Sequence, residues 1–146
     1  MVNQRTSIRY VAIIATVCLL SVGITGCINQ AGYEFKGGIT PPKAVSDLMK
    51  NNRTVVLFVT QNNCPTCEQV KPKIAGLQAQ YRGTNVTFAH FNINDNATSF
   101  NVAKAYSVTA TPNTIVIRKD GAAAIFVGDF DTGTLKSAVE DARQWK

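Results

Sequence analysis

One stretch of the chain constrains its fold more than any other, because it joins a continuous apolar run to a closely spaced pair of cysteines. Residues 54–59 are uncharged and rich in β-branched side chains. A short run of this kind predicts a strand that is buried on both faces, as in a parallel sheet. A polar loop over residues 60–63 ends this strand, and Cys64 and Cys67 follow at the start of a segment with helical periodicity. The sequence therefore predicts a strand, a loop and a helix, with both cysteines at the junction.

The rest of the folded region alternates helical and extended patterns. We expect helices over residues 41–51, 64–81, 97–106 and 131–145, and further strands over residues 85–91, 114–118 and 122–127. The Asp120-Gly121 pair predicts a hairpin turn between the last two strands. Strands that alternate with helices and end in a hairpin predict an α/β fold, with a mixed central sheet flanked by helices on both faces.

Apolar residues at helical spacing predict which face of each helix is buried. Asp131 is expected to cap the last helix. The expected buried residues are Val70, Ile74, Leu77 and Tyr81 after the cysteines, Phe100, Ala103 and Tyr106 in the next helix, and Leu135, Ala138, Val139, Ala142 and Trp145 in the last.

The N-terminal residues have the pattern of an export signal. Arg5 and Arg9 precede an uncharged apolar stretch over residues 11–24, and small residues then lead to Cys27. This ending resembles the lipobox of bacterial-type lipoproteins, which implies that Cys27 is lipidated and becomes the mature N-terminus. The alternative is an uncleaved membrane helix over residues 10–28, since a span needs about 17–25 apolar residues. Both interpretations anchor the chain in the cell membrane and place the rest on the extracytoplasmic side.

The four cysteines divide into two pairs. Cys18 and Cys27 belong to the N-terminal segment, so only Cys64 and Cys67 remain in the folded region. A single pair at this spacing is not a structural disulfide framework. It also lacks the four ligands of a structural zinc site, and we expect no metal there. The pair is therefore available for redox chemistry.

The charge distribution argues against a nucleic-acid partner. The formal net charge is +6, but the basic residues are scattered and interleaved with acidic ones. Nucleic-acid binding proteins instead carry a basic stripe or patch, often with aromatic side chains between the charges. We expect a solvated surface and a monomer.

The position of the cysteine pair predicts its chemistry. Cys64 would meet the unpaired N–H groups and the positive dipole end of the following helix, which favour its reactive thiolate form. Cys67 would lie one turn further in and resolve the mixed disulfide. We therefore assign Cys64 as the nucleophile and Cys67 as the resolving thiol, the two roles that disulfide exchange needs.

From residue 42 to residue 145, the order of expected elements resembles that of the thioredoxin family. The apolar strand leads into the sequence Cys64-Pro65-Thr66-Cys67, and Pro72 lies where thioredoxins kink the active-site helix. Residues 108–115 resemble the segment that holds the family's cis-proline, and Gly128 follows the last strand, as a family glycine does. The resemblance implies a three-layer fold. Together with the N-terminal pattern, it divides the chain into an anchor over residues 1–27, a tether over residues 28–40 and a thioredoxin-like domain over residues 41–146.

The resemblance also implies the surroundings of the redox pair. Pro65, Thr66, Thr111 and Pro112 would bind the substrate, with the backbone of Thr111 pairing with an extended polypeptide. Pro112 would follow a cis peptide bond, whereas an ordinary loop proline is trans. No cofactor is expected, because the dithiol itself stores two electrons. The expected partners are protein thiols and disulfides, and a second redox protein that restores the pair.

Three positions depart from the thioredoxin pattern. Phe58 stands where the family carries a buried aspartate, Asn63 replaces its tryptophan, and Pro65-Thr66 replaces Gly-Pro. The buried acid helps to move the proton of the second cysteine, so its absence argues against a thioredoxin-grade reductant. A proline directly after the first cysteine resembles glutaredoxins and exported disulfide oxidants. Reductant, oxidant and isomerase activities all remain open.

The single histidine, His90, shares its strand phase with Val86 and Phe88. One hypothesis is that it assists proton transfer near Cys67. The alternative is a half-buried strand histidine whose ring hydrogen-bonds to a neighbouring group.

Two rival functions of the whole protein also remain. One is a copper-handling module that holds the metal with Cys64, Cys67 and His90, and the other is a redox-inactive domain that only binds a partner through Thr111-Pro112. The preferred interpretation is a thiol–disulfide oxidoreductase for extracytoplasmic proteins.

Overall fold

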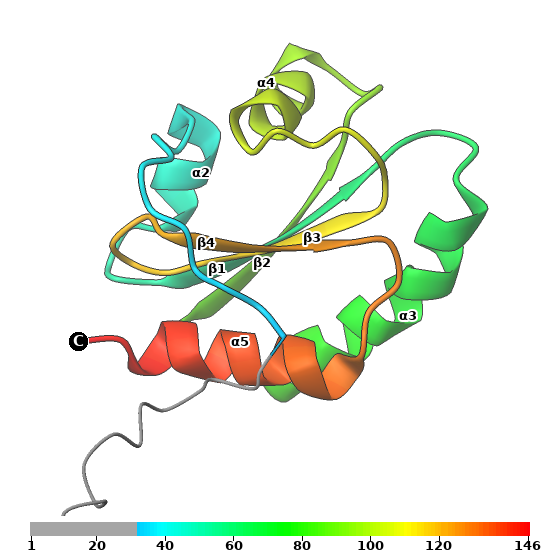
Figure 1. The fold of residues 1–146 in the computed structure, drawn as a ribbon. Coiled ribbons are helices and arrows are strands. Elements are labelled where there is room, and N and C mark those ends of the chain that lie inside the picture. The colour runs from blue at the N-terminus through cyan, green and yellow to red at the C-terminus, as the bar shows by residue number, and fades with distance from the viewer. Residues whose placement is uncertain (1–31) are drawn as a thin grey trace, which may run out of the picture. The chain divides into compact units, whose positions relative to one another are not determined.

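The computed structural model describes residues 32–146 (Figure 1). The expected anchor, including Cys18 and Cys27, and the start of the tether lie outside these residues. The described elements are α2 (Lys43–Leu48), β1 (Thr54–Thr60), α3 (Pro65–Gln80), β2 (Val86–Asn92), α4 (Ala97–Ala105), β3 (Asn113–Ile117), β4 (Ala123–Val127) and α5 (Thr132–Gln144). Within residues 32–146, no helix is long and apolar enough to cross a membrane.

The strands form one mixed sheet in the order β2-β1-β3-β4. β1 runs parallel to β2 and antiparallel to β3, and β3 and β4 form an antiparallel hairpin. Figure 1 shows α2 and α4 over one face of this sheet and α3 and α5 over the other. The predicted mixed sheet between two layers of helices is confirmed.

Each face of the sheet carries its own core, because side chains alternate along a strand. Val56 and Phe58 of β1 contribute to the core beneath α3 and α5. Val55, Leu57 and Val59 contribute to the opposite core beneath α2 and α4. All seven residues of β1 are buried, as expected for a strand covered on both faces.

The buried face of α3 follows the predicted spacing, with Val70, Ile74 and Leu77 in the core and Tyr81 at the helix end. Polar contacts also tie α3 to the α5 side of the domain. The Tyr81 hydroxyl donates to Glu140 at 2.7 Å. Hydrogen bonds from Arg143 and Tyr81 hold the pKa of Glu140 below its ordinary value. These contacts fix the C-terminal end of α3 and so help to orient its N-terminal end.

The first helix is shorter than expected. α2 spans Lys43–Leu48 rather than residues 41–51. Asn51 and Asn52 adopt left-handed backbone conformations, with φ of 64° and 57°. A right-handed helix does not continue through such residues, so the prediction over residues 41–51 was wrong at its C-terminal end.

The buried faces of α4 and α5 each differ from the prediction at one aromatic residue. Phe100 is 57% exposed, and Ser99 and Val102 face the core with Ala103 and Tyr106. Asn96 sets this phase, because its side chain accepts from the Ser99 N–H and so fixes where α4 begins.

Trp145 is 47% exposed because α5 ends at Gln144 and the backbone leaves the helix there. Its ring instead contacts the Arg118 guanidinium, whose carbon lies 3.7 Å from the ring centroid. The rest of the α5 face and its Asp131 cap are as predicted.

Part of the expected tether packs onto the domain. Tyr33 and Phe35 are half-buried against the core beneath α3 and α5. Lys36 forms a backbone bridge to Ala123, with N···O distances of 2.9 and 3.0 Å. Residues 33–36 are therefore held along one edge of the sheet.

Leu77→Ala tests the core beneath α3. Because Leu77 is 1% exposed, we expect the free energy of unfolding to fall by about 2–5 kcal/mol. Phe100→Ala is the matched control and should change it by less than about 0.5 kcal/mol, since Phe100 is exposed. Urea unfolding followed by circular dichroism measures both. Equal losses in the two variants would contradict the described core.

Candidate active site

The two cysteines of the folded domain form a disulfide. The Cys64–Cys67 S–S distance is 2.00 Å and the Cα atoms are 5.2 Å apart. Both residues lie where β1 gives way to α3, as the sequence predicts. The Cys64–Cys67 disulfide therefore lies at the junction of β1 and α3.

The helix start distinguishes the two sulfurs. Cys64 is the N-cap residue of α3, and its Sγ accepts from the Cys67 N–H at 3.1 Å. Pro65 opens the helix, where its missing N–H costs nothing. Cys64 is half-buried, whereas Cys67 is 1% exposed. Only Cys64 combines access from solvent with a position at the positive end of the helix dipole.

A loop from the other half of the domain reaches Cys64. The Thr111 Oγ1 lies 3.8 Å from the Cys64 Sγ, within range of a weak O–H···S hydrogen bond. The Thr111–Pro112 peptide bond is cis, the geometry that the thioredoxin resemblance implies. The Pro112 carbonyl accepts from the Gly128 N–H at 2.8 Å, which ties this loop to the end of β4.

The predicted substrate-binding residues surround the accessible sulfur. Pro65 and Thr66 are exposed on the first turn of α3, and Thr111 is half-buried beside Cys64. Pro112 is buried directly before β3. The structure thus brings together residues from the helix and from the loop before β3 at one end of the sheet.

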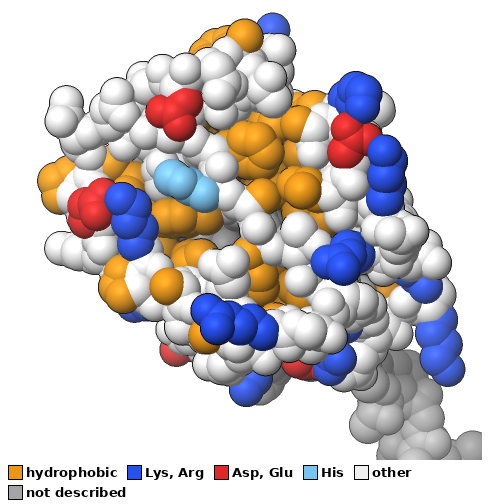
Figure 2. All heavy atoms as spheres, turned by 180° about the vertical axis from the view of Figure 1, so that it is seen from behind, with side chains coloured by type: hydrophobic (Ala, Val, Ile, Leu, Met, Phe, Trp, Pro, Cys, Tyr) orange, Lys and Arg blue, Asp and Glu red, His pale blue; other side chains and the backbone are white. Residues whose placement is uncertain are grey.

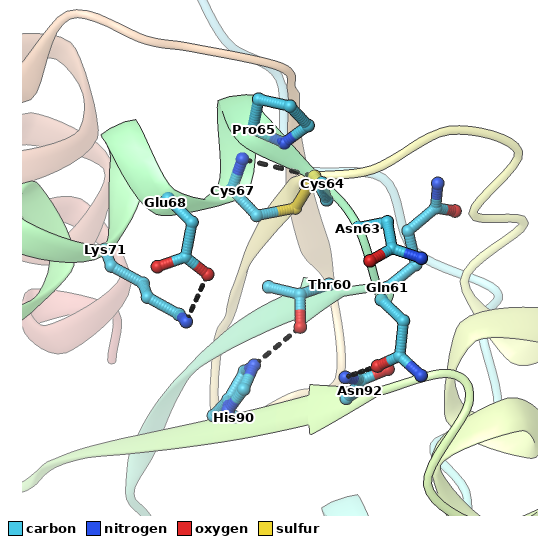
Figure 3. Close-up of a pocket in the computed structure, with 11 residues that line it drawn as sticks. Thr60, Gln61, Asn63, Cys64, Pro65, Cys67, Glu68, Lys71, His90 and Asn92 are labelled. Carbon is cyan, nitrogen blue, oxygen red and sulfur yellow. Dashed lines mark hydrogen bonds and ion pairs between the residues drawn. A yellow bond between two sulfur atoms is a disulfide. The ribbon is translucent and has the colours of Figure 1, made fainter.

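A polar pocket of about 730 Å³ opens beside the disulfide (Figure 3). The β1–α3 loop and the first turns of α3 form one side, and the end of β2 forms the other. Its lining residues are Thr60, Gln61, Asn62, Asn63, Cys64, Pro65, Cys67, Glu68, Lys71, His90 and Asn92. The sequence did not predict this pocket, because it depends on how the end of β2 lies against the loop.

Asparagine amides fix the loop that leads to Cys64. The Asn62 N–H donates to the Asn94 side chain at 2.8 Å, and the Asn92 amide donates to the Asn62 side chain at 2.8 Å. Asn63 adopts a left-handed conformation, with φ of 54°. Sequence reasoning missed these contacts, and their only signal was the high asparagine content around both strand ends.

His90 lies at the same pocket as Cys67. Its Nε2 is 2.7 Å from the Thr60 Oγ1, and its ring stacks on Phe58 with centroids 5.5 Å apart. His90 is exposed rather than half-buried, and Figure 2 shows it at the surface beside acidic and basic side chains. The sequence anticipated a histidine near Cys67 but not its partner, Thr60.

The copper alternative requires Cys64, Cys67 and His90 to come together as ligands. Among the residues that the structure describes, no three histidine, cysteine or acidic side chains are grouped to hold a metal ion. Both sulfurs are joined to each other. A metal ion would have to bind the reduced pair, because neither sulfur is a free thiolate in the disulfide.

Comparison with known proteins agrees with this geometry. Residues 41–143 match the family model described as a thioredoxin-like domain. No curated protein sequence matches the chain.

Three solved structures share the fold. A Fasciola hepatica thioredoxin is 24% identical, with a TM-score of 0.57, over 67% of this chain and 90% of that one. Oxidized mitochondrial thioredoxin 3 from Saccharomyces cerevisiae is 21% identical, with a TM-score of 0.57, over 67% and 87%. A mutant thioredoxin from Halobacterium salinarum is 19% identical, with a TM-score of 0.59, over 74% and 90%. The match over residues 41–143 shows that the chain belongs to the thioredoxin-like family.

Proposed function

We propose that this protein is a thiol–disulfide oxidoreductase that acts on disulfides or dithiols of extracytoplasmic proteins. One observation carries the redox part of the proposal: a Cys64–Cys67 disulfide at the N-terminus of α3, next to Thr111. Membership of the thioredoxin-like family supports the same class of chemistry.

Exchange proceeds through two sulfur displacements. In the reducing direction, the Cys64 thiolate attacks a substrate disulfide and forms a mixed disulfide, and one substrate thiolate leaves. The Cys67 thiolate then attacks the Cys64 sulfur, the mixed disulfide breaks and the second substrate thiolate leaves. Two electrons pass to the substrate, and the pair ends as the Cys64–Cys67 disulfide. The oxidising direction is the exact reversal of these steps.

The loop before β3 supplies the substrate contact. Because the Thr111 side chain touches the Cys64 sulfur, an extended polypeptide that pairs with the Thr111 backbone would present its own sulfur to Cys64. Pro65 and Thr66 border the same sulfur from the helix side. Pro112 holds the loop through its bond with the Gly128 N–H.

Turnover needs a second redox protein that restores the pair after each exchange. Phe58 is buried where thioredoxins carry an acid, which favours an oxidant or isomerase over a strong reductant.

We further propose that the N-terminal segment anchors a monomer to the cell membrane, through lipidated Cys27 or an uncleaved helix, with the domain on the extracytoplasmic side.

Trapping distinguishes the two cysteine roles. Cys67→Ser leaves Cys64 able to attack but unable to be released, so this variant should accumulate a mixed disulfide with a disulfide-bonded test protein. When both variants also carry Cys18→Ser and Cys27→Ser, Cys64→Ser should accumulate none, because the one remaining thiol, that of Cys67, is buried. Non-reducing gels measure both products. Equal trapping by the two variants, or trapping by Cys64→Ser alone, would contradict the assigned roles.

Cys27→Ser tests the anchor. If Cys27 is lipidated, the variant should stay unprocessed and incorporate no labelled fatty acid, because the acceptor sulfur is gone. Cys18→Ser is the matched control and should be processed normally. Mass spectrometry and fatty-acid labelling follow both changes. Normal labelling of the Cys27→Ser variant would rule out the lipoprotein interpretation and leave the uncleaved helix.

A further inference from the structure

Each exchange must move a proton to or from the sulfur of Cys67, which is 1% exposed. A buried thiol resists ionisation, because its charged form loses hydration. A group that accepts this proton would therefore speed the step in which Cys67 attacks the mixed disulfide. Phe58, which stands where the thioredoxin resemblance places an acid, is apolar and buried in the core on this face of the sheet.

The pocket beside Cys67 contains three candidate side chains with ionisable groups. Glu68 and Lys71 come from α3, and His90 comes from β2. The Glu68 carboxylate and the Lys71 ammonium are already paired with each other in an ion pair. β1 and the loop over residues 61–63 add only apolar, hydroxyl or amide side chains to the pocket. His90 is the remaining candidate.

Two contacts hold the His90 ring in the pocket that Cys67 also lines. Phe58 stacks on the ring, and the register that pairs Phe58 with His90 fixes this contact. The Nε2 atom meets the hydroxyl of Thr60, whose side chain is buried at the end of β1. In Figure 3, Thr60 lies between His90 and the disulfide. A hydroxyl both donates and accepts hydrogen bonds, so it can link an imidazole to a third group.

We propose that His90 is the proton-transfer residue for Cys67 and that Thr60 positions it; this inference rests on the proposed oxidoreductase function. In the resolving step, the Cys67 S–H proton passes through the pocket to the neutral imidazole. The Cys67 thiolate attacks the Cys64 sulfur, the Cys64–Cys67 bond forms, and the bond from Cys64 to the substrate sulfur breaks. The substrate leaves as a thiolate. In the reverse direction, the imidazolium returns the proton as Cys67 is released.

A two-phase reaction isolates this step. The full chain carrying Cys18→Ser and Cys27→Ser, so that only Cys64 and Cys67 are thiols, is reduced and mixed with an aromatic disulfide that releases a coloured thiol. The first equivalent of colour reports attack by Cys64, and the second reports resolution by Cys67. The pH dependence of the second phase is recorded as well, because a group that accepts a proton adds its own ionisation to the rate of the step that it assists.

His90→Gln should slow the second phase at least about tenfold at neutral pH and change its pH dependence, because an amide accepts no proton. Thr60→Val should resemble His90→Gln, whereas Thr60→Ser, which keeps the hydroxyl, should retain the original profile. The first phase should be unchanged in all three variants. Glu68→Gln and Lys71→Gln are matched controls in the same pocket and should keep the pH dependence.

The outcomes separate this inference from the proposed function. A second phase with the same rate and pH profile in His90→Gln would overturn the role of His90. A slower second phase with a changed pH dependence in Glu68→Gln, rather than in His90→Gln, would assign the proton to the carboxylate and overturn it equally. Absence of any second equivalent in the parent protein would contradict disulfide formation by the pair, and hence the proposed function itself.

Discussion

The burial of β1 on both faces positions every part of the active site. This strand lies between β2 and β3, and all of its residues are covered by one helical layer or the other. A shift of one residue would move Val56 and Phe58 out of the core beneath α3 and α5 and into the opposite core, which is packed around other side chains. Its end therefore fixes where the loop over residues 61–63 begins and where α3 places Cys64 and Cys67.

The neighbours of β1 bring the remaining groups to that end of the sheet. β3 starts directly after Pro112, so its pairing with β1 sets Thr111 against the accessible sulfur of Cys64. β2 runs parallel to β1 and carries His90 beside Thr60. The two sulfurs thus face different surroundings: Cys64 meets the substrate loop, and buried Cys67 borders a polar pocket. This asymmetry suits one sulfur for attack and the other for resolution.

The sequence predicted the features that arise from local chemistry. The β-branched run of β1, the apolar spacing of α3 and the cysteines at their junction each follow from neighbouring residues. The contact between Thr60 and His90 could not be predicted, because it depends on the parallel register of two strands separated along the chain. Phe100 was wrongly predicted to be buried for a related reason. Apolar spacing identifies the buried face of a helix only when the first residue of the helix is known, and here the Asn96 cap determines that residue.

The central claim is that Cys64 and Cys67 exchange two electrons reversibly. A redox titration of the full chain carrying Cys18→Ser and Cys27→Ser, with free thiols scored by alkylation and mass spectrometry, tests it most directly. We expect a single cooperative two-electron transition, and its midpoint would separate a reductant near about −270 mV from an isomerase or oxidant at about −180 to −120 mV. Thiols that remain free across the whole range, or a disulfide that no dithiol buffer reduces, would contradict the account.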